Sequence, residues 1–219
     1  MFNILIYSFL LPIIVYLILR KRIQNDKRML VLVFYSISIF IFLFFEFPIE
    51  KGLKNTLYTI TEFLFFSTLI YQQLKTQRNK SILIFLAIVC IVIQVIHFLT
   101  VKKVRLDSIP IGIETILIFF FTFLYFQEQL KKSDQFFINK NYFTWIAIGI
   151  LVYLGGCFFI YLLANNLTYH ELIQYWKFTY IVELIKNALF IIAMFLFAKE
   201  QSKVNGTSKN PLPNLDFTL

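Results

Sequence analysis

Long apolar runs, separated by short polar connections, fill most of the chain. Seven runs are long enough to cross a hydrocarbon layer of about 30 Å when each helical residue rises about 1.5 Å. Their approximate ranges are 2–19, 29–46, 57–74, 81–99, 108–127, 142–163 and 178–198. The pattern therefore predicts an all-α integral membrane protein, in which residues 1–198 form a bundle of seven transmembrane helices.

The two ends of the chain differ in character. The first run follows "MFN" and is followed by "RKR", which is the reverse of the charge order in a secretory signal peptide. We expect it to remain as the first helix, with a kink at Pro12, because proline lacks a backbone donor. Residues 199–219 are polar and contain two prolines, so we expect a flexible tail.

Basic residues predict the orientation of the bundle, because lysine and arginine near helix ends stay on the cytoplasmic side. Fourteen of them lie on the side reached after the first, third, fifth and seventh runs, and six lie on the other side. The N-terminus is therefore expected outside and the C-terminus in the cytoplasm.

Composition supports a membrane location. Hydrophobic residues make up 59% of the 219 positions, and mean hydropathy is +0.74. The net charge of +9 comes from basic residues in short runs between apolar segments, whereas a nucleic-acid-binding domain gathers them on one face. We therefore expect a multi-pass protein of the cytoplasmic (inner) membrane, with the lipid bilayer as partner and no nucleic acid.

Four charged side chains interrupt the apolar runs. They are Glu62, Glu114, Glu183 and Lys186. A charge at this depth costs about 2.5–3.5 kcal/mol on insertion scales, so each needs a partner, a cavity or a function. The glutamates lie on the third, fifth and seventh runs, which cross in the same direction, at similar distances from the outer boundary.

Further polar residues fall at the same predicted level. Tyr58 lies one turn before Glu62, and Asn187 follows Lys186. Gln94 and His97 share one face of the fourth helix, together with Cys90. These eight residues predict an outward-facing polar pocket for a small ligand, a cation or a proton. They are Tyr58, Glu62, Gln94, His97, Glu114, Glu183, Lys186 and Asn187. The alternative is that they serve only as hydrogen-bonding contacts between helices, with Glu183 and Lys186 neutralising each other.

Catalysis has weaker support. His97, Glu62, Glu114 and Glu183 are the candidate ligands for a metal-dependent intramembrane hydrolase. The chain, however, has only two histidines and lacks an HExxH motif, a GxSxG elbow and a phosphate-binding glycine loop. The sequence therefore favours a non-enzymatic protein, and it predicts no cofactor.

Two families share general features with the chain. Seven helices, an outside N-terminus and Lys186 in the last helix resemble microbial rhodopsins, in which such a lysine binds retinal. Here the acid precedes the lysine by three residues rather than four, and no tryptophan lies at mid-depth. In topology and size, the chain also resembles the seven-helix membrane sensor modules of some bacterial histidine kinases. That resemblance implies detection of a small ligand or membrane state and a separate cytoplasmic signalling partner.

The hypothesis we favour is a non-enzymatic, receptor-like membrane sensor. The second is a small ion- or proton-coupled transporter that uses the same glutamates. A transporter built from inverted repeats would have matching halves with broken helices, and the sequence lacks such a pair.

Overall fold

The computed structural model describes residues 2–23, 26–45, 51–100, 108–131, 141–163 and 166–207. Within these ranges the chain is helical and contains no strand. The helices are α1 (Phe2–Ser8), α2 (Leu10–Ile23), α3 (Lys27–Phe44), α4 (Lys51–Tyr71), α5 (Gln77–Thr100), α6 (Ser108–Leu130), α7 (Tyr142–Leu163) and α8 (Tyr169–Thr207).

Five of these helices are long and apolar enough to cross a membrane: α3, α5, α6, α7 and α8. The protein is therefore an all-helical, multi-pass membrane protein. The other helices fall short for identifiable reasons. The first predicted span is divided into α1 and α2, which have 7 and 14 residues. Helix α4 carries Lys51, Lys54 and Glu62.

The division of the first span corrects the prediction of one helix over 2–19. The helix breaks at Phe9, and α2 starts at Leu10 with Pro12 in its first turn. Because Pro12 has no backbone N–H, it cannot donate to the carbonyl of Ser8, and the helix ladder is interrupted there. The expected kink is thus a break between two helices.

Helix α8 is longer at both ends than the predicted span of 178–198. At its start, the backbone N–H of Thr168 donates to the Glu171 carboxylate at 2.9 Å, and the Glu171 N–H donates back to the Thr168 hydroxyl. This reciprocal capping box stabilises the first turn. At its other end the helix continues to Thr207, through residues that we assigned to the tail. Residues 208–219 lie outside the described part of the chain.

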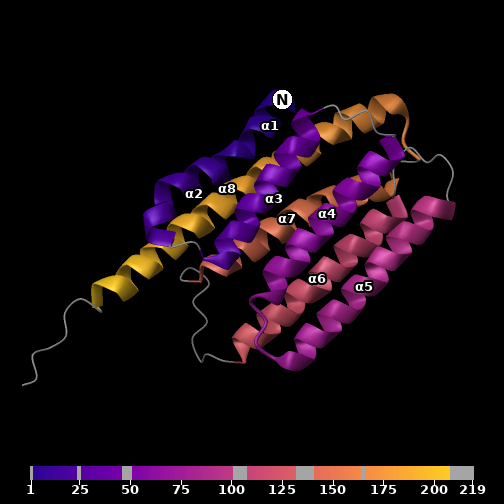
Figure 1. Ribbon diagram of the computed structural model, residues 1–219. Helices are drawn as coiled ribbons and strands as arrows, with labels where there is room; N and C mark the ends of the chain where they lie inside the picture. The colour runs from indigo at the N-terminus through magenta and orange to yellow at the C-terminus, as the bar shows by residue number, and fades with distance from the viewer. Residues whose placement is uncertain are drawn as a thin grey trace, which may run out of the picture.

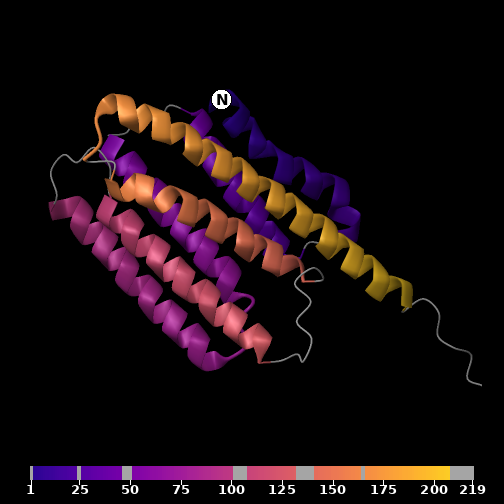
Figure 2. The same cartoon turned by 180° about the vertical axis from the view of Figure 1, so that it is seen from behind.

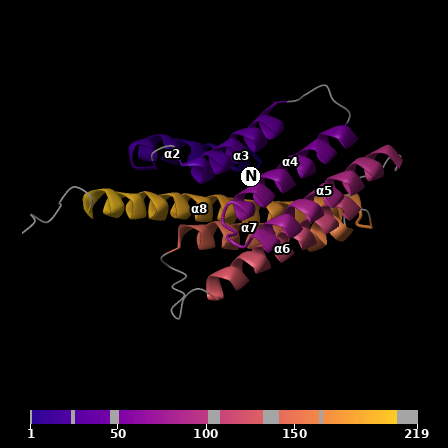
Figure 3. The same cartoon turned by 60° about the horizontal axis from the view of Figure 1, so that its bottom comes forward.

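Six helices form a ring. Contacts run in the order α2, α3, α4, α6, α7, α8 and back to α2, while α5 packs against α4 and α6 only from outside. Figure 1 shows α8 running the length of the bundle beside α2 and α7, and Figure 2 shows that its end extends beyond them. In Figure 3, α5 lies at the edge of the molecule beside α4 and α6.

The helices are held together by aromatic packing and by one close approach. Tyr35, Phe66, Tyr153 and Phe190 are fully buried inside the ring. On α7, a Cβ added to Gly156 would lie 2.7 Å from Val182 Cγ1 of α8. A larger residue at this position would clash with Val182, so α7 and α8 pack closely here.

Candidate functional site

A cavity of about 200 Å³ lies inside the ring. It is near the end of the bundle where α4, α6 and α8 begin, since Ile111, Glu114 and Trp176 from early turns of α6 and α8 line it. Its walls come from α1, α3, α4, α6, α7, α8 and Phe9. Helix α5 contributes nothing to it.

All three glutamates named from the sequence line this cavity. Glu62 comes from α4, Glu114 from α6 and Glu183 from α8, and each is buried. The three carboxyl groups therefore share one internal space, although 121 positions separate the first from the last along the chain.

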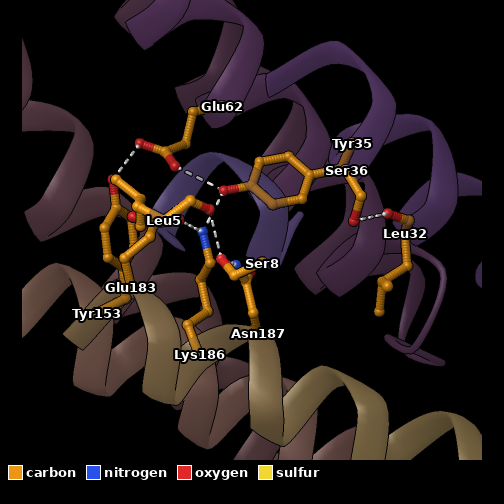
Figure 4. A network of polar contacts seen from close by, with 10 residues as sticks. All are labelled: Leu5, Ser8, Leu32, Tyr35, Ser36, Glu62, Tyr153, Glu183, Lys186 and Asn187. Atoms are coloured by element: carbon orange, nitrogen blue, oxygen red, sulfur yellow. Dashed lines mark hydrogen bonds and ion pairs between the residues drawn. The ribbon is translucent and has the colours of Figure 1, made fainter. Parts of the chain in front are cut away.

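Glu62 is held by two tyrosine hydroxyls. Tyr35 of α3 donates to Oε1 at 2.8 Å, and Tyr153 of α7 donates to Oε2 at 3.2 Å. Each carboxylate oxygen thus has its own donor, and the three residues tie α3, α4 and α7 together. Figure 4 shows the carboxylate between the two phenol groups.

Lys186 lies beside this carboxylate but does not line the cavity. Its ammonium group forms an ion pair with Glu183 of the preceding turn and donates to the Tyr35 hydroxyl at 2.5 Å. Tyr35 accordingly accepts from Lys186 and donates to Glu62. The interactions form a continuous chain from Glu183 through Lys186 and Tyr35 to Glu62 (Figure 4).

Aromatic rings surround the Lys186 ammonium group. The distances from Nζ to the ring centroids range from 4.2 Å for Tyr153 to 5.9 Å for Phe190. A cation at such distances is attracted by the negative face of a ring, and the attraction is stronger when water is excluded. Because Lys186 has no exposed surface, these rings and Glu183 take the place of water around its ammonium group. The rings belong to Phe9, Tyr35, Phe66, Tyr153 and Phe190.

Glu114 differs from the other two acids. Its side chain is only 2% exposed, yet Oε1 accepts no hydrogen bond from any described residue. A buried carboxylate oxygen without a donor is costly, because it has lost its hydration and has nothing in exchange. Glu114 is therefore the acid of the cavity most in need of a partner from outside the protein.

Tyrosine and tryptophan make up much of the remaining wall. Apart from the acids, the polar lining consists of amide and hydroxyl groups from Asn55, Thr59 and Thr179. The aromatic lining residues that can also hydrogen-bond are Tyr58, Tyr153, Tyr161, Trp176 and Tyr180. Among the predicted residues, Tyr58 thus shares the cavity with the three glutamates.

Three predicted residues lie elsewhere. Asn187 does not line the cavity; its Nδ2 donates to Ser8 Oγ of α1 at 2.8 Å. Gln94 and His97 are also absent from the wall, because α5 packs outside the ring. Gln94 is buried, with its Nε2 3.6 Å from Cys90 Sγ, whereas His97 is only partly buried. Cys90 and Gln94 do share one buried face of α5, but this helix lies outside the ring around the cavity.

The metal ligand set suggested by the sequence does not assemble. In the described ranges, no three His, Cys, Asp or Glu side chains lie close enough together to hold a metal ion. His97 is on the outer helix, and the three glutamates are spread around the cavity wall. The structure therefore does not bring His97, Glu62, Glu114 and Glu183 together as one metal-binding group.

Several residues of the site escaped the sequence analysis. Tyr35 lies in the middle of an apolar run, where a tyrosine is easily taken for packing. Trp176 and Tyr180 were not among the predicted residues, yet Trp176, Tyr180 and Glu183 fall at i, i+4 and i+7 and form one helical face. That spacing was the available signal for two of the missed residues.

Comparison with known proteins does not identify a family or a function for this site. No protein-family model matches the sequence, and no curated protein or solved structure matches the chain significantly.

Proposed function

We propose that the protein is a membrane sensor, a receptor-like bundle of seven passes whose internal cavity binds a small ligand. In this proposal α1 and α2 together form the first pass and α4 forms the third. The N-terminus lies outside, and the cavity opens to that side. Positions of the basic residues support this orientation.

The observation that carries the proposal is that the three buried glutamates share one cavity. Acids serving only as contacts between helices would each pair within a separate packing seam. Instead they surround one space, and Glu114 Oε1 lacks a donor within the described residues. An arrangement of this kind suits a site that is completed by a bound molecule or proton.

Helix α8 supports a role in signalling. Near its start it contributes Trp176, Thr179, Tyr180 and Glu183 to the cavity wall. Its 39 residues span about 58 Å at 1.5 Å per residue, which exceeds the roughly 30 Å hydrocarbon layer. A shift of its first half on ligand binding would move residues at its far end, where a cytoplasmic partner would detect it.

The sensor hypothesis can be tested with a label at the far end of α8. Ser202 is exposed, whereas Cys90 and Cys157 are both buried, so a thiol-reactive fluorophore should label only the S202C variant's new cysteine. The labelled protein in lipid nanodiscs would be titrated with protons, sodium, potassium and small organic ammonium ions. In the same samples, with Trp145 exchanged for Phe, Trp176 fluorescence would report binding at the cavity.

A sensor should change the label's emission whenever Trp176 reports that a probe has bound. Exchange of Glu114 for Gln should weaken both responses to a charged probe together. Binding at Trp176 with no change at the label would contradict signal transmission through α8.

A transporter is the second candidate, and the acid-rich interior favours it because buried carboxylates are common in proton and cation pathways. The same purified protein in proteoliposomes would distinguish the two functions. A transporter should accumulate labelled substrate under a pH gradient, and exchange of Glu62 for Gln should stop the flux. Binding without flux would leave the sensor hypothesis as the better one.

A further inference from the structure

We infer that the ligand of the cavity is a small organic ammonium ion. Its charged nitrogen is joined by a short chain to an aromatic ring or to a compact apolar group. This inference depends on the proposed function only in that the cavity binds a ligand. It does not require α8 to transmit a signal.

Charge around the cavity provides the first argument. Among the described residues, the wall contains three acidic side chains and no basic one. The buried lysine nearby is already committed to Glu183 and the Tyr35 hydroxyl. If all three acids were ionised, Lys186 would balance only one of them. A positively charged ligand would offset part of the excess, whereas an anion would increase the repulsion.

Glu114 provides a specific contact for such a charge. Only 2% of Glu114 is exposed, and its Oε1 has no hydrogen-bond donor among the described residues. An ammonium N–H placed in the cavity would supply the missing donor and a charge-assisted hydrogen bond. A neutral ligand without a donor would leave this oxygen unsatisfied.

The aromatic wall favours an organic cation over a bare metal ion. Tyr58, Trp176 and Tyr180 line the cavity beside the acids. The protein already uses this chemistry for its own ammonium group, since Lys186 Nζ lies 4.2 Å from the centroid of the Tyr153 ring. Tyr153 also lines the cavity, so the same residue contacts the internal cation and the space for a second one. Aromatic rings with nearby carboxylates are typical of ammonium recognition.

Size restricts the ligand further. An engineered apolar cavity of about 150 Å³ in another protein accepts benzene, and pockets for drug-sized molecules begin at about 300 Å³. At about 200 Å³, this cavity has room for a benzene-sized ring with a short charged arm. Lipids and peptides are too large to fit inside it.

The test uses 2-phenylethylammonium as the probe and Trp176 as the reporter. The chain has two tryptophans, and Trp145 Nε1 has no partner among the described residues, so exchange of Trp145 for Phe loses no hydrogen bond. The W145F protein in lipid nanodiscs would then be titrated with 2-phenylethylammonium, with neutral 2-phenylethanol and with anionic phenylacetate. All three carry the same ring but differ in charge.

We expect saturable binding of 2-phenylethylammonium, at least about tenfold tighter than binding of 2-phenylethanol, and no binding of phenylacetate. Exchange of Glu114 for Gln should weaken ammonium binding by about tenfold or more and leave the alcohol unchanged. Exchange of Glu200 for Gln is the matched control, because it removes an equal charge from an exposed position on α8. A W176F variant with Trp145 retained corrects for partitioning of the probes into lipid.

Equal affinity for the alcohol and the ammonium ion would overturn the inference, as would tighter binding of phenylacetate. These comparisons need no substitution in the acids, so they decide the question even if the Glu114 variant does not fold.

The two proposals can also fail separately. Ammonium binding at Trp176 without a response at the Ser202 label contradicts only the sensor. A label that responds to protons or metal ions, but not to 2-phenylethylammonium, contradicts only the ligand class.

Discussion

At the scale of single residues, the buried Lys186 is held by several kinds of contact. A lysine in the apolar part of a helix must either lose its proton or find compensating contacts. Lys186 has an ion pair with Glu183, a hydrogen bond to Tyr35 and five surrounding rings. The interactions also place the Tyr35 hydroxyl to donate to Glu62. One side chain thus organises two of the three acids.

Removal of Lys186 alone should be costly. Exchange of Lys186 for Met leaves Glu183 buried without its cation, and we expect the free energy of unfolding to fall by about 3 kcal/mol or more. Adding the exchange of Glu183 for Gln should restore most of that loss, because the unpaired charge is gone. Denaturant titration in micelles would measure both. Exchange of exposed Lys199 for Met is the control, and strictly additive effects of the two buried substitutions would contradict the pairing.

At the scale of helices, α8 and the broken first span determine the form of the site. The break at Phe9 places this residue in the cavity wall and among the aromatic rings around Lys186. Close packing of α7 on α8 at Gly156 places Val182 against α7, one position before Glu183. The position of Glu183 therefore depends on how closely the Val182 side chain packs on the Gly156 backbone.

Substitution of Gly156 tests this contact. An added methyl group would lie 2.7 Å from Val182 Cγ1, so exchange of Gly156 for Ala should lower the free energy of unfolding by about 1–3 kcal/mol. Exchange of Gly112 for Ala is the matched control, since nothing lies within 4 Å of the added atom. There the change should be neutral or stabilising by up to about 1 kcal/mol, because alanine favours the helix. Thermal unfolding in micelles would compare them, and equal shifts would show that the contact is unimportant.

At the scale of the whole molecule, the ring of six helices with α5 outside explains which polar residues meet. Exposed apolar side chains on α5, such as Phe85, Ile88 and Leu99, fit a surface that faces lipid. Inside the ring, the cavity lies toward one end, and buried side chains such as Phe197 pack nearer the other end. A site at one end is consistent with access from one side of the membrane.

Labelling of α8 would determine the orientation. Gln174 and Ser202 are both exposed on this helix, on opposite sides of Glu183. We expect Gln174→Cys to react with an impermeant thiol reagent in intact cells, and Ser202→Cys to react only after the membrane is opened. The reverse pattern would show that the N-terminus and the cavity face the cytoplasm. Reaction of both from the same side would exclude a single crossing by α8.

The sequence alone determined the all-helical membrane architecture, and it singled out Glu62, Glu114 and Glu183 as charges within apolar runs. Apolar length and the cost of burying charge act locally, so they can be recognised in one helix at a time. Only the tertiary structure decided that these three acids share a cavity, that Gln94 and His97 are outside it, and that Tyr35 links Lys186 to Glu62. Those relations depend on the rotation of each helix about its axis and on its place in the ring. Both are set by packing between residues far apart in the chain.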